Sequence, residues 1–273
     1  MKLRALLLSC CLFISCTAQA MAGQTTGQTL VLIHGYLGNG SEWLNSGVVS
    51  VLQRAGFNYL GHLSPTGYYP TQQLTSTSPR YIYTLTLPSE APLLVQAQWL
   101  TQYMQALQAR HPNNQLILIG HSAGGVIARL SMVEFRLPAN TLITIASPHL
   151  GTQMAEWGLM ASESPLGLFA PFFGMNTLNR SHDLYLDLVR EAPNTLLYWL
   201  NRQPHPQANY ISIVRTNHNP VGITDPLVPS YSQDLNNVIA LQGQATTVPS
   251  IGTHPLQPTD GILLLTILAR LPN

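Results

Sequence analysis

The stretch QLILIGHSAG, residues 115–124, decides the fold class. Its first five residues are almost entirely apolar, which predicts a strand buried on both faces of a sheet. Residues 123–135 then predict a helix, and the turn between the two elements carries the G-x-S-x-G motif in the strand–turn–helix setting that a nucleophilic serine requires. Gly120 and Gly124 are small enough for this tight turn. We therefore expect Ser122 to project at the carboxyl edge of a sheet, beside a helix N-terminus that favours developing negative charge.

Strands and helices alternate on both sides of this motif. The expected strands cover residues 29–33, 57–63, 81–87, 115–119, 141–146, 209–214 and 237–242, and the expected helices cover residues 41–55, 91–110, 123–135 and 261–271. Residues 64–80 are polar and rich in proline, glycine and threonine, so they predict a loop. This alternation predicts an α/β fold, a mostly parallel sheet with flanking helices.

The order of elements changes after Thr152. Residues 156–175 combine glycine and proline with many large apolar side chains, and residues 182–201 predict further helix interrupted at Pro193. This segment is either an irregular part of the core or a mobile cap whose apolar face covers a substrate cleft. Because glycine and proline interrupt it so often, we favour a helical cap, or lid, inserted at about residues 152–205.

The serine needs partners, because its hydroxyl is a weak nucleophile at neutral pH. In folds with this motif the chain order is serine, acid, histidine. His254 is the only histidine after Asp225, so we expect a triad of Ser122, Asp225 and His254. His254 would take the serine proton and give it to the leaving group, while Asp225 would orient the imidazole and stabilise its charged form.

Other residues could fill these roles. The alternatives are Asp183 or Asp187 as the acid, with His205 or His218 as the base. Asp225 precedes a proline, so the alternative interpretation of this residue is a plain turn former. Of the other nearby acids, Asp260 is typical of a helix start, and Asp234 lies in a polar connection.

An oxyanion intermediate needs two hydrogen-bond donors. One is the backbone N–H of Ala123, the residue after the nucleophile, and the other should come from the loop after an early strand. Tyr36 occupies such a loop, so its N–H is the second candidate, and Gly35 allows close approach of the backbone. We interpret His34 as a structural brace for this loop rather than as a proton carrier.

Four motifs together resemble those of bacterial lipases and esterases of the α/β-hydrolase superfamily. They are HGY at residues 34–36, GHSAG at 120–124, SPHLG at 147–151 and DPLVP at 225–229. The resemblance spans about residues 31–260, with tight matching only at these motifs. It implies an α/β-hydrolase fold, ester hydrolysis and a lid after the PHxG segment. It also implies that His149 is a structural or near-site residue and not the base.

The chain departs from these lipases in three ways. Pro226 follows the predicted acid where they usually have glycine. Many of them hold a structural calcium ion near the triad histidine, and the sequence offers no clear acidic pair for one. Some have disulfides, which this chain cannot form in its mature part. We therefore expect no metal ion or other cofactor, with calcium kept as an alternative.

The N-terminus predicts export. Lys2 and Arg4 precede an apolar run, and Ala18-Gln19-Ala20 is typical of a signal-peptide cleavage site, so residues 1–20 should be removed and residues 21–273 should form the hydrolase domain. The expected location is periplasmic or secreted. The segment ending at Cys16 also resembles a lipoprotein box, so a lipid anchor at Cys16 is the alternative. All three cysteines lie within this N-terminal segment.

Composition narrows the function classes. From Met21 onward there are ten Arg, no Lys and eleven acids, a net charge of −1. Such a chain lacks both the basic surface that nucleic acids require and the lysine of a phosphate-binding loop. We expect a small-molecule or lipid ester as substrate, with transient contact with a membrane or lipid surface. An acyltransferase or a thioesterase with the same triad, and a non-catalytic binding protein of this fold, are the alternatives.

Overall fold

The computed structural model describes residues 27–71, 76–164, 176–216 and 225–272. The predicted signal peptide, Cys16 and His218 lie outside these ranges, as does part of the predicted cap, residues 165–175. The described ranges contain no helix with the length and apolar character needed to cross a membrane.

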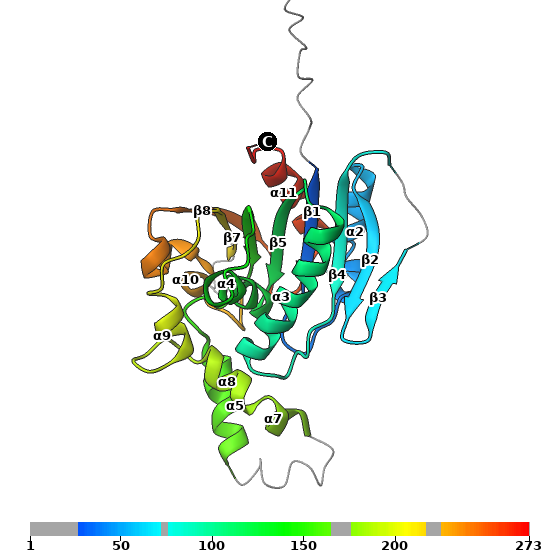
Figure 1. Ribbon diagram of the computed structural model, residues 1–273. Coiled ribbons are helices and arrows are strands. Elements are labelled where there is room, and N and C mark those ends of the chain that lie inside the picture. Colours follow the sequence, from blue (N-terminus) through cyan, green and yellow to red (C-terminus); the bar gives the residue numbers. More distant parts are fainter. Residues whose placement is uncertain (1–26, 72–75, 165–175, 217–224, 273) are drawn as a thin grey trace, which may run out of the picture.

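One sheet of eight strands organises the molecule (Figure 1), in the spatial order β3-β2-β4-β1-β5-β6-β7-β8. The strands are β1 (Gln28–Ile33), β2 (Asn58–Ser64), β3 (Gly67–Pro70), β4 (Arg80–Leu85), β5 (Gln115–His121), β6 (Thr141–Ile145), β7 (Asn209–Thr216) and β8 (Ala245–Ile251). All neighbouring pairs are parallel except β2 and β3, which form an antiparallel hairpin. The predicted α/β architecture is therefore confirmed.

Helices cover both faces of the sheet. Helices α3 (Leu93–Arg110) and α4 (Ala123–Glu134) pack on one face, and α1 (Ser41–Asn45), α2 (Val48–Arg54) and α11 (Pro258–Leu268) pack on the other (Figure 1). Strand β1 shows why both layers form, because side chains alternate along a strand. Val31 and Ile33 enter the first core, and Leu30 and Leu32 enter the second.

The end of the chain differs from the prediction at one strand. Residues 237–242 were expected to be a strand, but Ile239–Leu241 form a 3-10 helix and the last strand is β8, Ala245–Ile251. The prediction is wrong because β8 lies at an edge of the sheet, where half-exposed polar residues replace the apolar run of a central strand. The apolar residues Val238 and Leu241 lie in a connecting segment, and their side chains are buried.

Two smaller predictions also need correction. Strand β3 lies inside residues 64–80, which we expected to be a loop throughout. It is short and largely exposed, so it carries no apolar signal. The single helix expected at residues 41–55 is two helices, because Gly47 between them has φ +80°, a left-handed conformation that ends a helix.

In the described part of the segment between β6 and β7, four helices occupy the region predicted as a cap. They are α5 (Gln153–Glu163), α7 (Asn176–Arg180), α8 (His182–Leu188) and α9 (Leu196–Leu200). Helices α5, α7 and α8 gather beyond one end of the sheet, at the bottom of Figure 1. That this insertion acts as a cap stays a prediction.

Candidate active site

The turn at Ser122 has the geometry that the sequence predicts. Ser122 connects β5 to α4 with φ 53° and ψ −130°, a conformation that is strained for a residue with a side chain. A Cβ atom on Gly120 would lie 2.4 Å from the Cα atom of Gly125, and one on Gly124 would lie 2.5 Å from the carbonyl oxygen of His34. Both glycines are therefore sterically required.

Gly125 is a further requirement that sequence reasoning missed. A Cβ atom there would lie 2.2 Å from Oγ of Ser147, so the start of α4 is pressed against the segment after β6. The run of three small residues from Ala123 to Gly125 is the sequence feature that could have indicated this close packing.

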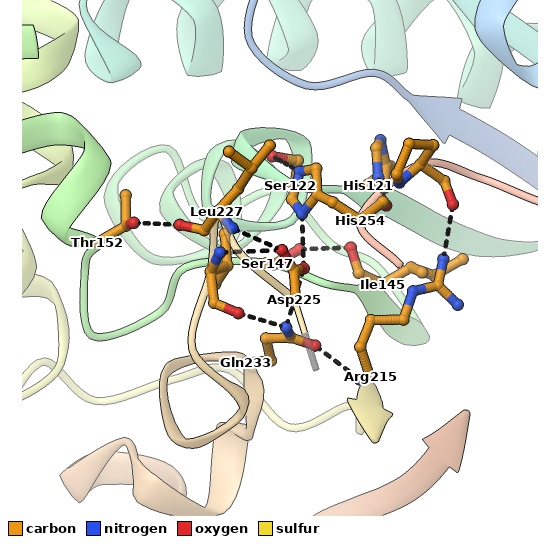
Figure 2. A network of polar contacts seen from close by, with 12 residues as sticks. His121, Ser122, Ile145, Ser147, Thr152, Arg215, Asp225, Leu227, Gln233 and His254 are labelled. Atoms are coloured by element: carbon orange, nitrogen blue, oxygen red, sulfur yellow. Dashed lines mark hydrogen bonds and ion pairs between the residues drawn. The ribbon is translucent and has the colours of Figure 1, made fainter. Parts of the chain in front are cut away.

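The three predicted triad side chains meet in one hydrogen-bonded row (Figure 2). Oγ of Ser122 lies 2.9 Å from Nε2 of His254, and Nδ1 of His254 lies 2.7 Å from Oδ2 of Asp225. His254 comes from the loop between β8 and α11, and Asp225 comes from the segment after β7. With Nδ1 donating its proton to the carboxylate, Nε2 remains free to accept the serine proton.

Two of the alternative candidates, Asp187 and His205, have other partners. Oδ2 of Asp187 accepts the backbone N–H of Leu93 at 2.7 Å, near the start of α3. Nδ1 of His205 donates to the carbonyl of Gln203 at 2.8 Å. The row of three side chains contains neither Asp183 nor Asp187.

Asp225 is held as an ionised acceptor. Its Oδ1 accepts the backbone N–H groups of Leu227 at 2.9 Å and Val228 at 3.1 Å, and its Oδ2 also accepts Nε2 of Gln233 at 3.1 Å. Burial alone would raise the pKa of Asp225, but the hydrogen bond and charge of His254 and these backbone donors lower it below its ordinary value. Gln233, eight residues after Asp225, was missed because it belongs to none of the recognised motifs.

His121, the second residue of the motif, positions the triad histidine. Its Nε2–H donates to the carbonyl of His254 at 2.9 Å, and the two rings lie 5.1 Å apart. Burial, together with the neighbouring charge of His254, lowers the pKa of His121 to about 3, so the ring is neutral at physiological pH. It therefore acts as a fixed donor that orients the loop carrying His254.

The loop after β1 packs directly on the serine. A Cβ atom on Gly35 would lie 2.8 Å from the Cβ atom of Ser122, so only glycine fits. His34 braces this loop, because its Nδ1–H donates to the Gly35 carbonyl at 2.8 Å and its Nε2 accepts the N–H of Leu87 at 2.9 Å. Within the described ranges, the backbone N–H groups of Tyr36 and Ala123 donate to no other group, as an oxyanion site requires.

Two clefts meet at Ser122 and His254. The first, of about 490 Å³, is mainly apolar and lies between α5, α8 and the segment after Asp225. The second, of about 470 Å³, is lined by α1, His121 and the residues after His254. A larger hollow of about 1060 Å³ near the C-terminal end of α4 is lined by none of the three predicted triad residues, so its size does not make it the candidate site.

Among the described residues, no group of three or more His, Cys, Asp or Glu side chains could hold a metal ion. The buried His149 hydrogen bonds to Oγ1 of Thr144 at 3.1 Å and does not touch the triad.

The fold and the geometry around Ser122 define the class as α/β hydrolase. Residues 24–162 match the model of the "PGAP1-like alpha/beta domain", and residues 95–235 match that of the "Putative serine esterase (DUF676)" family. The chain belongs to these two overlapping families of α/β hydrolases. Comparison with curated proteins finds no match.

Solved structures show the same fold at low sequence identity. The product of the gene lin2722 from Listeria innocua has a TM-score of 0.61 and 17% identity, over 90% of this chain and 96% of that one. The mature form of the lipase BlEst2 from Bacillus licheniformis has a TM-score of 0.54 and 14% identity, over 90% of this chain and 94% of that one.

Proposed function

We propose that this protein is a lipase or carboxylesterase, a serine hydrolase that cleaves carboxylic esters with an apolar acyl chain. The observation that carries the proposal is the hydrogen-bonded row from Ser122 through His254 to Asp225, at the junction of two clefts. A strained serine beside an imidazole whose other nitrogen is held by a carboxylate is the arrangement for nucleophilic acyl transfer.

The proposed reaction has two halves. Nε2 of His254 takes the proton of Ser122 as its Oγ attacks the ester carbonyl, and the oxyanion is bound by the N–H groups of Tyr36 and Ala123. The imidazolium then protonates the leaving alcohol, which leaves an acyl-enzyme. Water, activated by the same histidine, releases the acid and regenerates the serine.

The apolar cleft supports an acyl chain as the bound group. Trp157, Leu184 and Leu188 line it, and its volume of about 490 Å³ is in the range of small-molecule sites. An acyltransferase or a thioesterase would use the same groups. Hydrolysis differs from transfer only in the acceptor, so product analysis with and without an added alcohol separates them.

Exposed apolar residues on α5 support contact with a lipid surface. Met154, Trp157 and Met160 recur every third residue and are 39%, 52% and 58% exposed. The N-terminal segment supports export, to the periplasm or the medium, with anchoring through Cys16 as the alternative.

The test is labelling by a fluorophosphonate, with the adduct mapped by mass spectrometry, and hydrolysis of p-nitrophenyl esters. Ser122→Ala should abolish both the labelling and the hydrolysis. The control variant Ser50→Ala changes an exposed serine on α2 and should keep both activities. Rates across C2 to C16 acyl chains should peak at C6 or longer. Full activity of Ser122→Ala would refute the proposal, and a peak at C2 would instead indicate a small-ester hydrolase.

A further inference from the structure

The second cleft at the triad contains one carboxylate. Glu42 on α1 lines it together with the polar residues Asn45 and Ser46, and its described lining includes no Arg or Lys. The first cleft is lined mainly by apolar side chains, and its described residues include no acid or base other than His254 and two tyrosines. The two clefts therefore differ in charge.

This difference in charge indicates which half of a bound ester would lie in which cleft. Ser122 and His254 line both clefts, so an ester carbonyl bound at Ser122 would extend in both directions. The acyl chain gains most free energy in the apolar cleft. The alcohol half, the leaving group, then lies in the cleft that contains Glu42.

The carboxylate of Glu42 lies close to Gly38 and has no hydrogen-bond donor among the described residues. A Cβ atom on Gly38 would lie 2.3 Å from Oε1 of Glu42, so the carboxylate packs against that loop. Oε2 lies 4.0 Å from Nδ1 of His121, which is beyond hydrogen-bonding distance. No described group donates to either oxygen, and the side chain is 39% exposed to solvent.

His121 cannot satisfy this carboxylate by a small movement. Its Nε2–H already donates to the carbonyl of His254, and the ring is neutral, so Nδ1 carries no proton. Nδ1 is buried and has no partner among the described residues either. Two acceptors, Nδ1 of His121 and the carboxylate of Glu42, thus face each other beside the leaving-group position, where a cation or a strong donor would satisfy Glu42.

We propose that Glu42 makes this cleft select esters of cationic alcohols, such as amino alcohols, over esters of neutral or anionic alcohols. This proposal rests on the ester hydrolysis proposed above. An ammonium group two carbons from the ester oxygen could reach the cleft lined by Glu42, whereas an anionic alcohol would be repelled.

The test compares three hexanoate esters. They are hexanoylcholine, its neutral carbon isostere 3,3-dimethylbutyl hexanoate, and the anionic ester of 3-hydroxypropanesulfonate. The measured quantity is the ratio of kcat/KM values. A partly exposed ion pair predicts a choline-to-isostere ratio of about fivefold in the wild type and a lower rate for the anionic ester.

Two variants of Glu42 and one control sharpen the test. Glu42→Gln should reduce the choline-to-isostere ratio by about fivefold, and Glu42→Asp should keep most of it. Glu134→Gln makes the same change of charge at the far end of α4, about 16 Å along the helix, and should leave the ratio unaltered. The ratio of kcat/KM values between two esters reports selection by charge even where a variant hydrolyses both esters more slowly.

Each outcome decides the proposal. A wild-type ratio near one, with the isostere hydrolysed, would overturn the selection by Glu42 while keeping the hydrolase. An equal loss for all three esters in Glu42→Gln would overturn it too, because Glu42 would then act by positioning His121. No hydrolysis of any ester, with Ser122 unlabelled by the fluorophosphonate, would overturn both proposals.

Discussion

Removing one partner of the buried ion pair behind the predicted triad should strongly destabilise the fold. Arg215, in β7, donates from Nη1 and Nη2 to the two carboxylate oxygens of Asp260, in the first turn of α11, at 2.6 and 3.0 Å. Their side chains are 1% and 0% exposed. The same guanidinium donates to Oγ of Ser250 in β8 and to the carbonyl of Pro255, next to His254. One pair therefore joins two strands, a helix and the loop of the triad histidine.

Asp260→Asn would leave the guanidinium buried without an opposite charge. Removing one partner of a buried pair costs about 3–5 kcal/mol. For a chain of this size each kcal/mol lowers Tm by about 2–4 °C, so we expect a drop of about 6–20 °C. Arg215→Met should reduce the free energy of unfolding by a similar amount, because it leaves the carboxylate of Asp260 buried without a positive partner.

Urea unfolding of the two single variants and the double variant measures the coupling between the two residues. The double variant should be much more stable than the sum of the single losses predicts, since neither partner is left uncompensated. Glu90→Gln breaks the exposed pair with Arg180 and serves as the control, with an expected loss below about 1 kcal/mol. A loss below about 1 kcal/mol for Asp260→Asn, or simple additivity, would refute the reasoning.

Two further predictions concern the neighbourhood of the serine. Burial lowers the pKa of His34 from 6.5 to about 4, so the unfolded chain binds a proton that the folded chain does not. Stability should therefore fall as pH drops from 6.5 to 4, and His34→Gln should remove up to about 3 kcal/mol of that fall in urea unfolding; identical pH profiles would contradict this. Gly124→Ala would place Cβ 2.6 Å from the Ile33 carbonyl oxygen and should cost about 1–3 kcal/mol and slow the labelling of Ser122. Gly252→Ala, where the nearest atom is 3.4 Å away, should cost little, and equal losses for the two variants would argue against steric exclusion.

The parts of the site that the sequence predicts are those encoded locally. The GHSAG motif contains both the serine and the glycines that its turn requires, so Ser122 could be placed without coordinates. His254 followed from chain order, because no other histidine lies beyond Asp225. The edge strands β3 and β8 were missed since half-exposed strands lack the apolar run that marks β5.

The supporting residues could not be predicted in the same way. Gln233 hydrogen bonds to Asp225 and Glu42 lines the second cleft, but each is an ordinary polar residue in its local sequence. The pairing of Arg215 with Asp260 depends on how the fold places β7 beside the start of α11, which the local sequence of neither residue indicates. The helix-start role of Asp260 was predicted from its neighbours, and Asp260 does lie in the capping box of α11.

The two outermost strands have a consequence for solubility. Strand β8 contains Pro249, and strand β3 is only four residues long and ends at Pro70. Proline offers no N–H for pairing, and short, polar outer strands are poor templates for a further chain. The sheet is thus protected against edge-to-edge aggregation, which suits a protein that we expect to be exported with no disulfide to hold it together.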